Sequence, residues 1–143
     1  MRTQMVGALS ATVLVLAAAG CGGTGGYENA ARPPAVLTIS IDVTGNGVAL
    51  SPSHIGAGPA VLLIVNESGR SRNLTLTAPS GSGRSCVADD ASSGPINPQG
   101  TARMQLPLVE GTCVVGVSDG TAAPARLAVG PERQSSQQDL LQP

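Results

Sequence analysis

The sequence predicts an all-β protein, built as a sandwich or barrel of about seven or eight short strands. Three observations support this fold class. Apolar and polar residues alternate in short runs between residues 36 and 130, which is typical of strands with one buried face. Residues that favour turns separate these runs at intervals of about ten residues. No part of this region combines a long helical periodicity with good helix formers.

The first two strands are predicted at residues 37–43 and 48–50. In the first, aliphatic side chains alternate with Thr38, Ser40 and Asp42, so one face is expected to be buried and the other polar. Residues 44–47 (Thr-Gly-Asn-Gly) are suited to a tight turn between the two strands.

Residues 60–65 (Ala-Val-Leu-Leu-Ile-Val) are continuously apolar. They lie between Gly58-Pro59 and the polar residues 66–69, so we expect a central strand that is buried on both faces. Leu74 and Leu76 then alternate with polar residues and predict the next strand.

The second half of the chain continues this pattern. A short strand is expected at residues 86–88, and residues 89–100, which contain two Gly and two Pro, are expected to form a long loop. Alternation predicts the last three strands at residues 102–106, 113–117 and 125–129. Met104 belongs to a core-facing set and is expected to fill space there.

The composition restricts both the core and the partners. Phe and Trp are absent and Tyr27 is the only aromatic residue, so the core must be aliphatic and platforms for stacking bases or sugars are missing. The formal net charge is −1 and the chain has no Lys. A concentrated basic face is therefore absent, and no nucleic-acid partner is expected.

The first twenty residues have the form of a secretory signal. Arg2 provides the positive end, residues 5–19 are uncharged and largely apolar, and small residues follow up to Cys21. The apolar run is shorter than the roughly 20 residues that a membrane-spanning helix needs. We therefore expect a cleaved signal peptide at residues 1–20 rather than a retained anchor.

Residues 18–21 (Ala-Ala-Gly-Cys) resemble the bacterial lipobox, in which small residues precede a Cys that is acylated on its sulfur. The resemblance implies that Cys21 carries lipid and holds the protein on the extracytoplasmic face of the cell membrane. The alternative is ordinary cleavage after Ala19, which leaves Cys21 as a free thiol. Residues 21–35 are expected to form a flexible tether, residues 36–130 the folded domain, and residues 131–143 a flexible tail.

The three cysteines fit the lipoprotein interpretation. An odd thiol is a liability in an exported protein, and acylation of Cys21 leaves Cys86 and Cys113 as one pair. Two cysteines in one small exported domain usually form a disulfide, which we expect here. A redox-active pair is the alternative, but no Cys-x-x-Cys motif supports it.

Three stretches resemble the cupredoxins, the copper proteins that include plastocyanin and azurin. Residues 52–66 look like that family's Ala-Gly-Pro turn followed by a strand that ends in Asn. Residues 97–102 are similar to its Pro-Gly-x-Thr strand start, and residues 110–113 (Glu-Gly-Thr-Cys) are similar to its Pro-Gly-Thr-Tyr. The resemblance covers about residues 36–130 and implies a Greek-key β-sandwich.

The copper ligands of that family are not matched. A blue-copper site needs two His, a Cys thiolate and usually an axial Met. At the corresponding positions this chain has Asn73, Val117 and the residues 118–120 (Ser-Asp-Gly). His54 is the only His, and we expect it in a solvated turn, with weak metal binding as the alternative. No cofactor is therefore expected.

Other candidate sites are weak. No serine nucleophile has a Gly-x-Ser-x-Gly context, so no triad can be assembled around the single His. We expect solvated surface at the acidic pair Asp89-Asp90. We expect the same of Arg70, Arg72 and Arg84, which could cluster near two turns.

The sequence predicts a membrane-anchored, non-enzymatic envelope lipoprotein with an unidentified envelope partner. A copper or redox accessory protein, using His54 and a Met, is the alternative.

Overall fold

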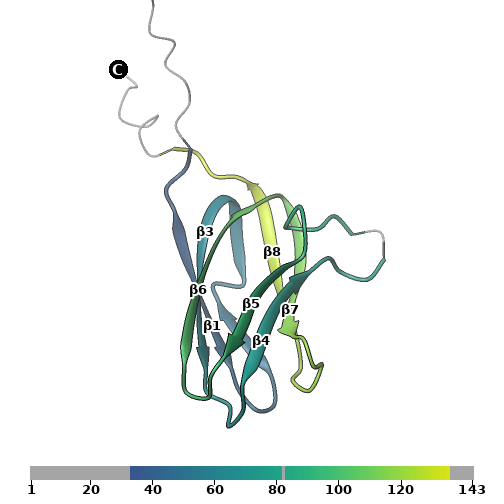
Figure 1. Ribbon diagram of the computed structural model, residues 1–143. Helices are drawn as coiled ribbons and strands as arrows, with labels where there is room; N and C mark the ends of the chain where they lie inside the picture. Colours follow the sequence, from purple (N-terminus) through teal and green to yellow (C-terminus); the bar gives the residue numbers. More distant parts are fainter. Residues whose placement is uncertain (1–32, 82, 136–143) are drawn as a thin grey trace, which may run out of the picture.

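The computed structural model describes residues 33–81 and 83–135, which form eight β-strands and no helix (Figure 1). The predicted fold class, an all-β sandwich of seven or eight strands, is confirmed. The strands are β1 (Leu37–Val43), β2 (Val48–Ser51), β3 (His54–Asn66), β4 (Arg72–Thr77), β5 (Ala91–Ile96), β6 (Thr101–Leu108), β7 (Gly111–Val117) and β8 (Ala125–Glu132).

Two sheets share the long strand β3. One sheet has the order β2-β1-β3-β6, in which β1 and β3 are parallel and the other pairs are antiparallel. The other sheet has the order β3-β8-β7-β4-β5, in which only the short pairing of β3 with β8 is parallel. Three of the seven strand pairings join consecutive strands and four join strands that are not consecutive, as in a Greek-key sandwich.

β3 passes from one sheet to the other through a sharp bend. Its first residues pair with β8, and residues from Ala60 onward pair with β1 and β6. The register shifts between Gly56 and Ala57, and Gly58 has φ 132°, a conformation that side chains disfavour. Figure 1 shows β3 arching over one end of the sandwich. The strand therefore begins at His54, six residues before the predicted start.

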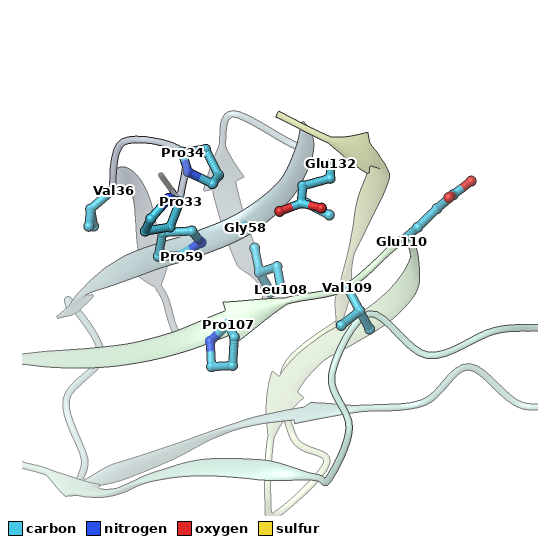
Figure 2. A pocket seen from close by; sticks show the side chains of 11 residues that line it. Pro33, Pro34, Val36, Gly58, Pro59, Pro107, Leu108, Val109, Glu110 and Glu132 are labelled. Carbon is cyan, nitrogen blue, oxygen red and sulfur yellow. The ribbon is translucent and has the colours of Figure 1, made fainter. Parts of the chain in front are cut away.

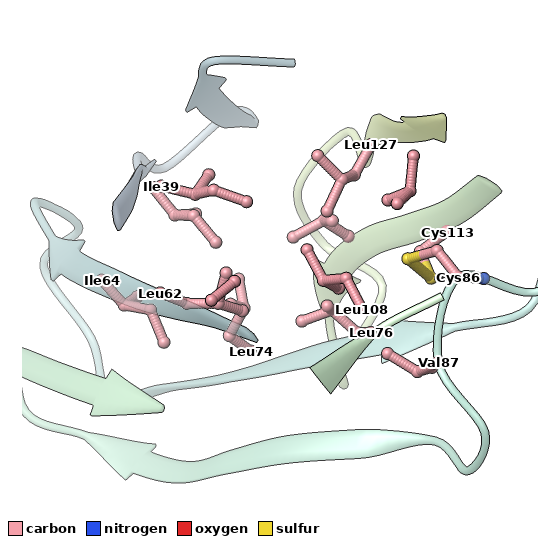
Figure 3. Packing of buried hydrophobic residues seen from close by; sticks show 14 of the residues in the cluster. Ile39, Leu62, Ile64, Leu74, Leu76, Cys86, Val87, Leu108, Cys113 and Leu127 are labelled. Atoms are coloured by element: carbon pink, nitrogen blue, oxygen red, sulfur yellow. Dashed lines mark hydrogen bonds between the residues drawn. A yellow bond between two sulfur atoms is a disulfide. The ribbon is translucent and has the colours of Figure 1, made fainter. Parts of the chain in front are cut away.

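The core between the sheets is aliphatic, as the composition requires. On β1, Ile39, Ile41 and Val43 are buried and alternate with exposed polar residues. Figure 3 shows Ile39 among other core side chains, with the Cys86–Cys113 disulfide at one edge. Met104 is partly buried and packs against this cluster.

Two predictions in the middle of the chain were wrong. Residues 89–100 contain β5 rather than only loop, and residues 86–88 are not a strand. β5 is an edge strand that pairs only with β4, so Pro95 and Gly94 interrupt a single ladder, and the register shifts between Asn73 and Thr75. Cys86 and Val87 are buried through the disulfide and core contacts and not through a strand pairing of their own.

The two ends of the described chain lie at the same end of the sandwich, beside the β3 bend (Figure 1). β8 continues to Glu132, two residues beyond the predicted end of the domain. The predicted signal peptide, Cys21, most of the predicted tether and residues 136–143 lie outside the described residues.

Candidate functional site

The positions that the cupredoxin resemblance assigns to copper ligands are brought together at one corner. β4 and β7 pair with Leu74 opposite Val117, and the backbone N–H of Ser118 donates to the carbonyl of Asn73 at 2.9 Å. This corner lies at the end of the sandwich opposite the chain ends (Figure 1). The fold thus places these residues together, as a metal site would require.

The donor set at this corner does not fit a copper ion. Val117 is buried and apolar, and the Asn73 side-chain oxygen accepts a hydrogen bond from the Ser92 hydroxyl at 2.7 Å. Neither a thiolate nor an imidazole is among these residues, and both are needed for a blue-copper centre. Within residues 33–81 and 83–135, no three His, Cys, Asp or Glu side chains gather into a possible metal site.

Arg72 occupies the interior of this corner. Its side chain is about 3% exposed, and Nη1 lies 3.0 Å from Oδ2 of Asp119. Nε donates to the Ser68 hydroxyl at 3.1 Å, and Nη1 also donates to the hydroxyl of Thr121. A buried guanidinium requires such partners, because an unpaired charge in the interior is strongly unfavourable. The corner is therefore closed by a satisfied polar cluster.

Asp119 accepts hydrogen bonds that favour its ionised form. Thr121 donates both its backbone N–H, at 3.1 Å, and its hydroxyl, at 2.8 Å, to Oδ1 of Asp119. These two hydrogen bonds are the main reason that the pKa of Asp119 lies below the ordinary value, and Arg72 and Arg70 lower this pKa further. The carboxylate is thus committed to the loop and to Arg72.

Asn66 ties the loops of this corner together. It is fully buried at the end of β3, and Nδ2 donates to the carbonyls of Arg70, Ile96 and Asn97 at 2.9–3.0 Å. Its Oδ1 accepts from the backbone N–H and the hydroxyl of Ser68. One amide therefore joins the β3–β4 loop to the turn between β5 and β6.

Cys86 and Cys113 form the expected disulfide, and both residues are fully buried. The backbone N–H of Val109 donates to the carbonyl of Cys86 at 2.9 Å, so the bonded pair also fixes the β6–β7 connection. The disulfide anchors the end of the long β4–β5 connection on β7, as Figure 3 shows at the edge of the core. Its environment is that of a structural bond.

The remaining candidate residues do not converge. His54 is exposed at the first residue of β3, opposite Ala128, and not in a turn as predicted. Met104 lies on the other sheet, opposite Leu62. Asp89 and Asp90 are exposed, as expected.

The predicted solvated arginine surface is wrong in part. Arg70 and Arg84 are exposed, but Arg72 is buried in the corner cluster. The carbonyl of Arg84 accepts a hydrogen bond from Thr112, near the start of β7, whereas Arg72 lies beside the other end of that strand. The three arginines therefore do not form one patch.

An apolar groove lies at the other end of the molecule, where the chain ends meet. It has a volume of about 720 Å³. Pro59 on β3 faces Pro107 on β6, and neither residue has an N–H, so the ladder between these strands is interrupted at this point. Figure 2 shows the two prolines with Val36, Val109 and Pro34 around the opening. The lining residues are Pro33, Pro34, Val36, Ala57, Gly58, Pro59, Pro107, Leu108, Val109, Glu110 and Glu132.

Arg133 fixes the backbone around this groove. Its guanidinium donates to the carbonyls of Gly56, Ala57, Pro59 and Ala35, at 2.7–3.2 Å. Its own backbone N–H donates to Ala57. Arg133 falls in the region predicted as tail, and no sequence signal marks it. It joins the segment before β1 to the β3 bend.

No family model matches the sequence, and no curated protein matches it. Among solved structures, a copper-containing nitrite reductase from Thermus scotoductus is similar, with a TM-score of 0.45 and 9% identity over 75% of this chain. The match spans 30% of the nitrite reductase chain. Within the part of this chain that the structure describes, no helix is long and apolar enough to cross a membrane.

Proposed function

We propose that this protein is a lipid-anchored envelope lipoprotein whose cupredoxin-like sandwich is a non-catalytic binding or structural module without a resident metal. The chemistry of the corner between β4 and β7 carries this proposal. Where the resemblance places copper ligands, the chain has an amide, an apolar side chain and Asp119, and Asp119 is paired with Arg72. Such a cluster stabilises loops and has no group free to bind copper.

The anchoring part of the proposal depends on Cys21. Cys86 and Cys113 are bonded to each other, so Cys21 is the cysteine left for acylation. Pro33 and Pro34 lie at the end of the sandwich that is opposite the corner cluster. A lipid on Cys21 would therefore direct the corner cluster and its loops away from the bilayer.

Fractionation of bacteria that express the full chain tests the anchor. Wild-type protein should be recovered with membranes and should incorporate labelled palmitate, and the Cys21→Ala variant should lose both properties. The Cys86→Ala/Cys113→Ala double variant is the matched control and should remain labelled. Membrane recovery of Cys21→Ala at the wild-type level would contradict anchoring through this residue.

Copper titration of the purified protein tests the second part. The wild-type protein should show no thiolate-to-copper charge-transfer band and no tightly bound copper after dialysis, because the corner lacks a thiolate and an imidazole. Stoichiometric copper that is lost in a His54→Ala variant would instead favour a copper accessory role.

A further inference from the structure

The apolar groove is the place where exposed hydrophobic side chains concentrate. Among the described residues, the large hydrophobic side chains that are exposed are Val36 (59%), Leu37 (39%) and Val109 (45%). Val36 and Val109 line the groove, and Leu37 follows Val36 at the start of β1. Exposed apolar residues that gather at one end of a small domain mark a contact surface.

This surface is held in a fixed shape. The guanidinium of Arg133 donates hydrogen bonds to the carbonyl of Ala35, which precedes Val36, and to the carbonyl of Pro59 in the β3 bend. Val109 is fixed from the other side, because its N–H donates to Cys86, which the disulfide joins to β7. A preformed surface loses little conformational entropy when it is covered.

The short stretch of sequence between Cys21 and the first lining residue indicates what covers the groove. Pro33 and Pro34 line it, and Pro33 is 12 positions after Cys21 in the sequence. Twelve residues span at most about 40 Å when fully extended. A lipid on Cys21 therefore keeps this end close to the bilayer, where even weak contacts are favoured by a high effective concentration.

The charge of the groove selects the type of lipid. Glu110 and Glu132 line it, and the guanidinium of Arg133 beside it is occupied by backbone carbonyls. Figure 2 shows Glu132 beside Gly58 and Glu110 directed away from the opening. Binding to anionic lipid normally relies on clustered Lys and Arg, whereas two carboxylates repel such a surface.

We infer that the end of the sandwich around Val36, Leu37 and Val109 rests on the neutral part of the lipid surface, with these side chains in the headgroup region. This inference rests on the proposed lipid anchor at Cys21. It adds direct contact of this end with the lipid surface, which would hold the β3 bend toward the bilayer and the corner around Arg72 outward.

The absence of Trp from the chain provides a direct test. The experiment uses two full-length lipidated variants in phosphatidylcholine vesicles that contain brominated lipid. Val109→Trp places the reporter at the groove, and the matched Ser71→Trp variant places it in the exposed β3–β4 loop. Quenching of the Val109→Trp protein should be about threefold stronger, because interfacial apolar groups lie about 5–10 Å into the bilayer boundary. Adding Val36→Ser should reduce that quenching, and phosphatidylglycerol should reduce it further.

The other outcomes separate a wrong orientation from a failed anchor and from a different occupant of the groove. If both tryptophans are quenched equally while the protein stays on the vesicles, the orientation is wrong and the anchor stands. If Cys21→Ala protein binds vesicles as well as wild type, the anchor itself fails. A blue shift of the Val109→Trp protein in detergent-free solution that depends on protein concentration would show that a second copy covers the groove. A shift that disappears on truncation after Ser135 would assign the groove to residues 136–143. Either result would overturn the inference.

Discussion

Arg72 and Asp119 are 47 residues apart in sequence, yet Nη1 of the arginine lies 3.0 Å from Oδ2 of the aspartate. The pair links β4 to the β7–β8 loop at the corner where the resemblance would place copper. The arginine is buried and the carboxylate is partly exposed, so the pair connects the interior to the surface.

This pair predicts a pH dependence of stability. The hydrogen bonds from Thr121 and the nearby arginines lower the pKa of Asp119 in the folded state. The resulting stabilisation is complete above the unfolded-state pKa of about 3.9 and is lost as the pH falls through the lower folded-state pKa. The free energy of unfolding, measured with urea, should therefore fall more between pH 5 and pH 3 for wild type than for Asp119→Asn. The fall for Thr121→Val should be intermediate, and an equal fall for all three proteins would contradict this assignment.

Replacement of Asn66 should be among the most damaging single changes. Asn66→Ala removes the donors to three carbonyls and the acceptor for Ser68 in a fully buried place. Unsatisfied buried groups cost about 1–3 kcal/mol each, so we expect a loss of about 3 kcal/mol or more in the free energy of unfolding. Asn73→Ala, which removes one exposed hydrogen bond to Ser92, is the control and should cost about 1 kcal/mol or less. Equal losses for the two variants would refute the role of Asn66.

Loss of the disulfide should destabilise the domain without changing its fold. The bond joins residues separated by 27 positions, and a loop of this length corresponds to about 3–4 kcal/mol in the chain-entropy model. The Cys86→Ala/Cys113→Ala double variant should unfold at a correspondingly lower urea concentration and keep the far-UV circular dichroism of a β-protein. A stability unchanged from wild type would show that the bond is dispensable.

The bend of β3 should not tolerate a side chain at Gly58. Its φ is 132°, and a Cβ there would lie 2.7 Å from Cγ of Pro34 and 2.9 Å from Nη2 of Arg133. Gly58→Ala should cost about 2–4 kcal/mol, from the disfavoured backbone and the displaced neighbours. Gly45→Ala is the matched control, because a Cβ at Gly45 meets nothing within 4 Å, and it should be neutral or up to about 1 kcal/mol stabilising. Thermal unfolding of both variants measures the difference.

The alternation of apolar residues predicted most of the fold because every second side chain of a half-buried strand faces the core and must be apolar. Residues 37–43 and 113–117 were predicted with bounds close to those of β1 and β7. β5 was missed because Gly94 and Pro95 are usual in loops, and an edge strand with one partner tolerates them. The first part of β3 was missed for a similar reason, since Gly56, Gly58 and Pro59 serve a bend within a strand.

The candidate site was predictable only in part. The resemblance indicated which positions would meet, and the fold does bring Asn73 and Val117 together. The roles of Asn66, Arg72 and Asp119 depend on contacts between segments far apart in sequence, and no local pattern encodes them. The role of Arg133 could not be predicted because it lies in a polar segment without periodicity, although it donates to the carbonyls of Gly56 and Pro59.

Because both sheets share β3, the two sheets are coupled when the protein unfolds. Residues before Gly58 pair with β8, and residues after Pro59 pair with β1 and β6, so a single covalent strand is a structural member of both layers. Neither layer can separate at this end without tension on the other. Amide hydrogens of the two layers should therefore exchange with solvent through one common opening event, and the protein should behave as a single cooperative unit.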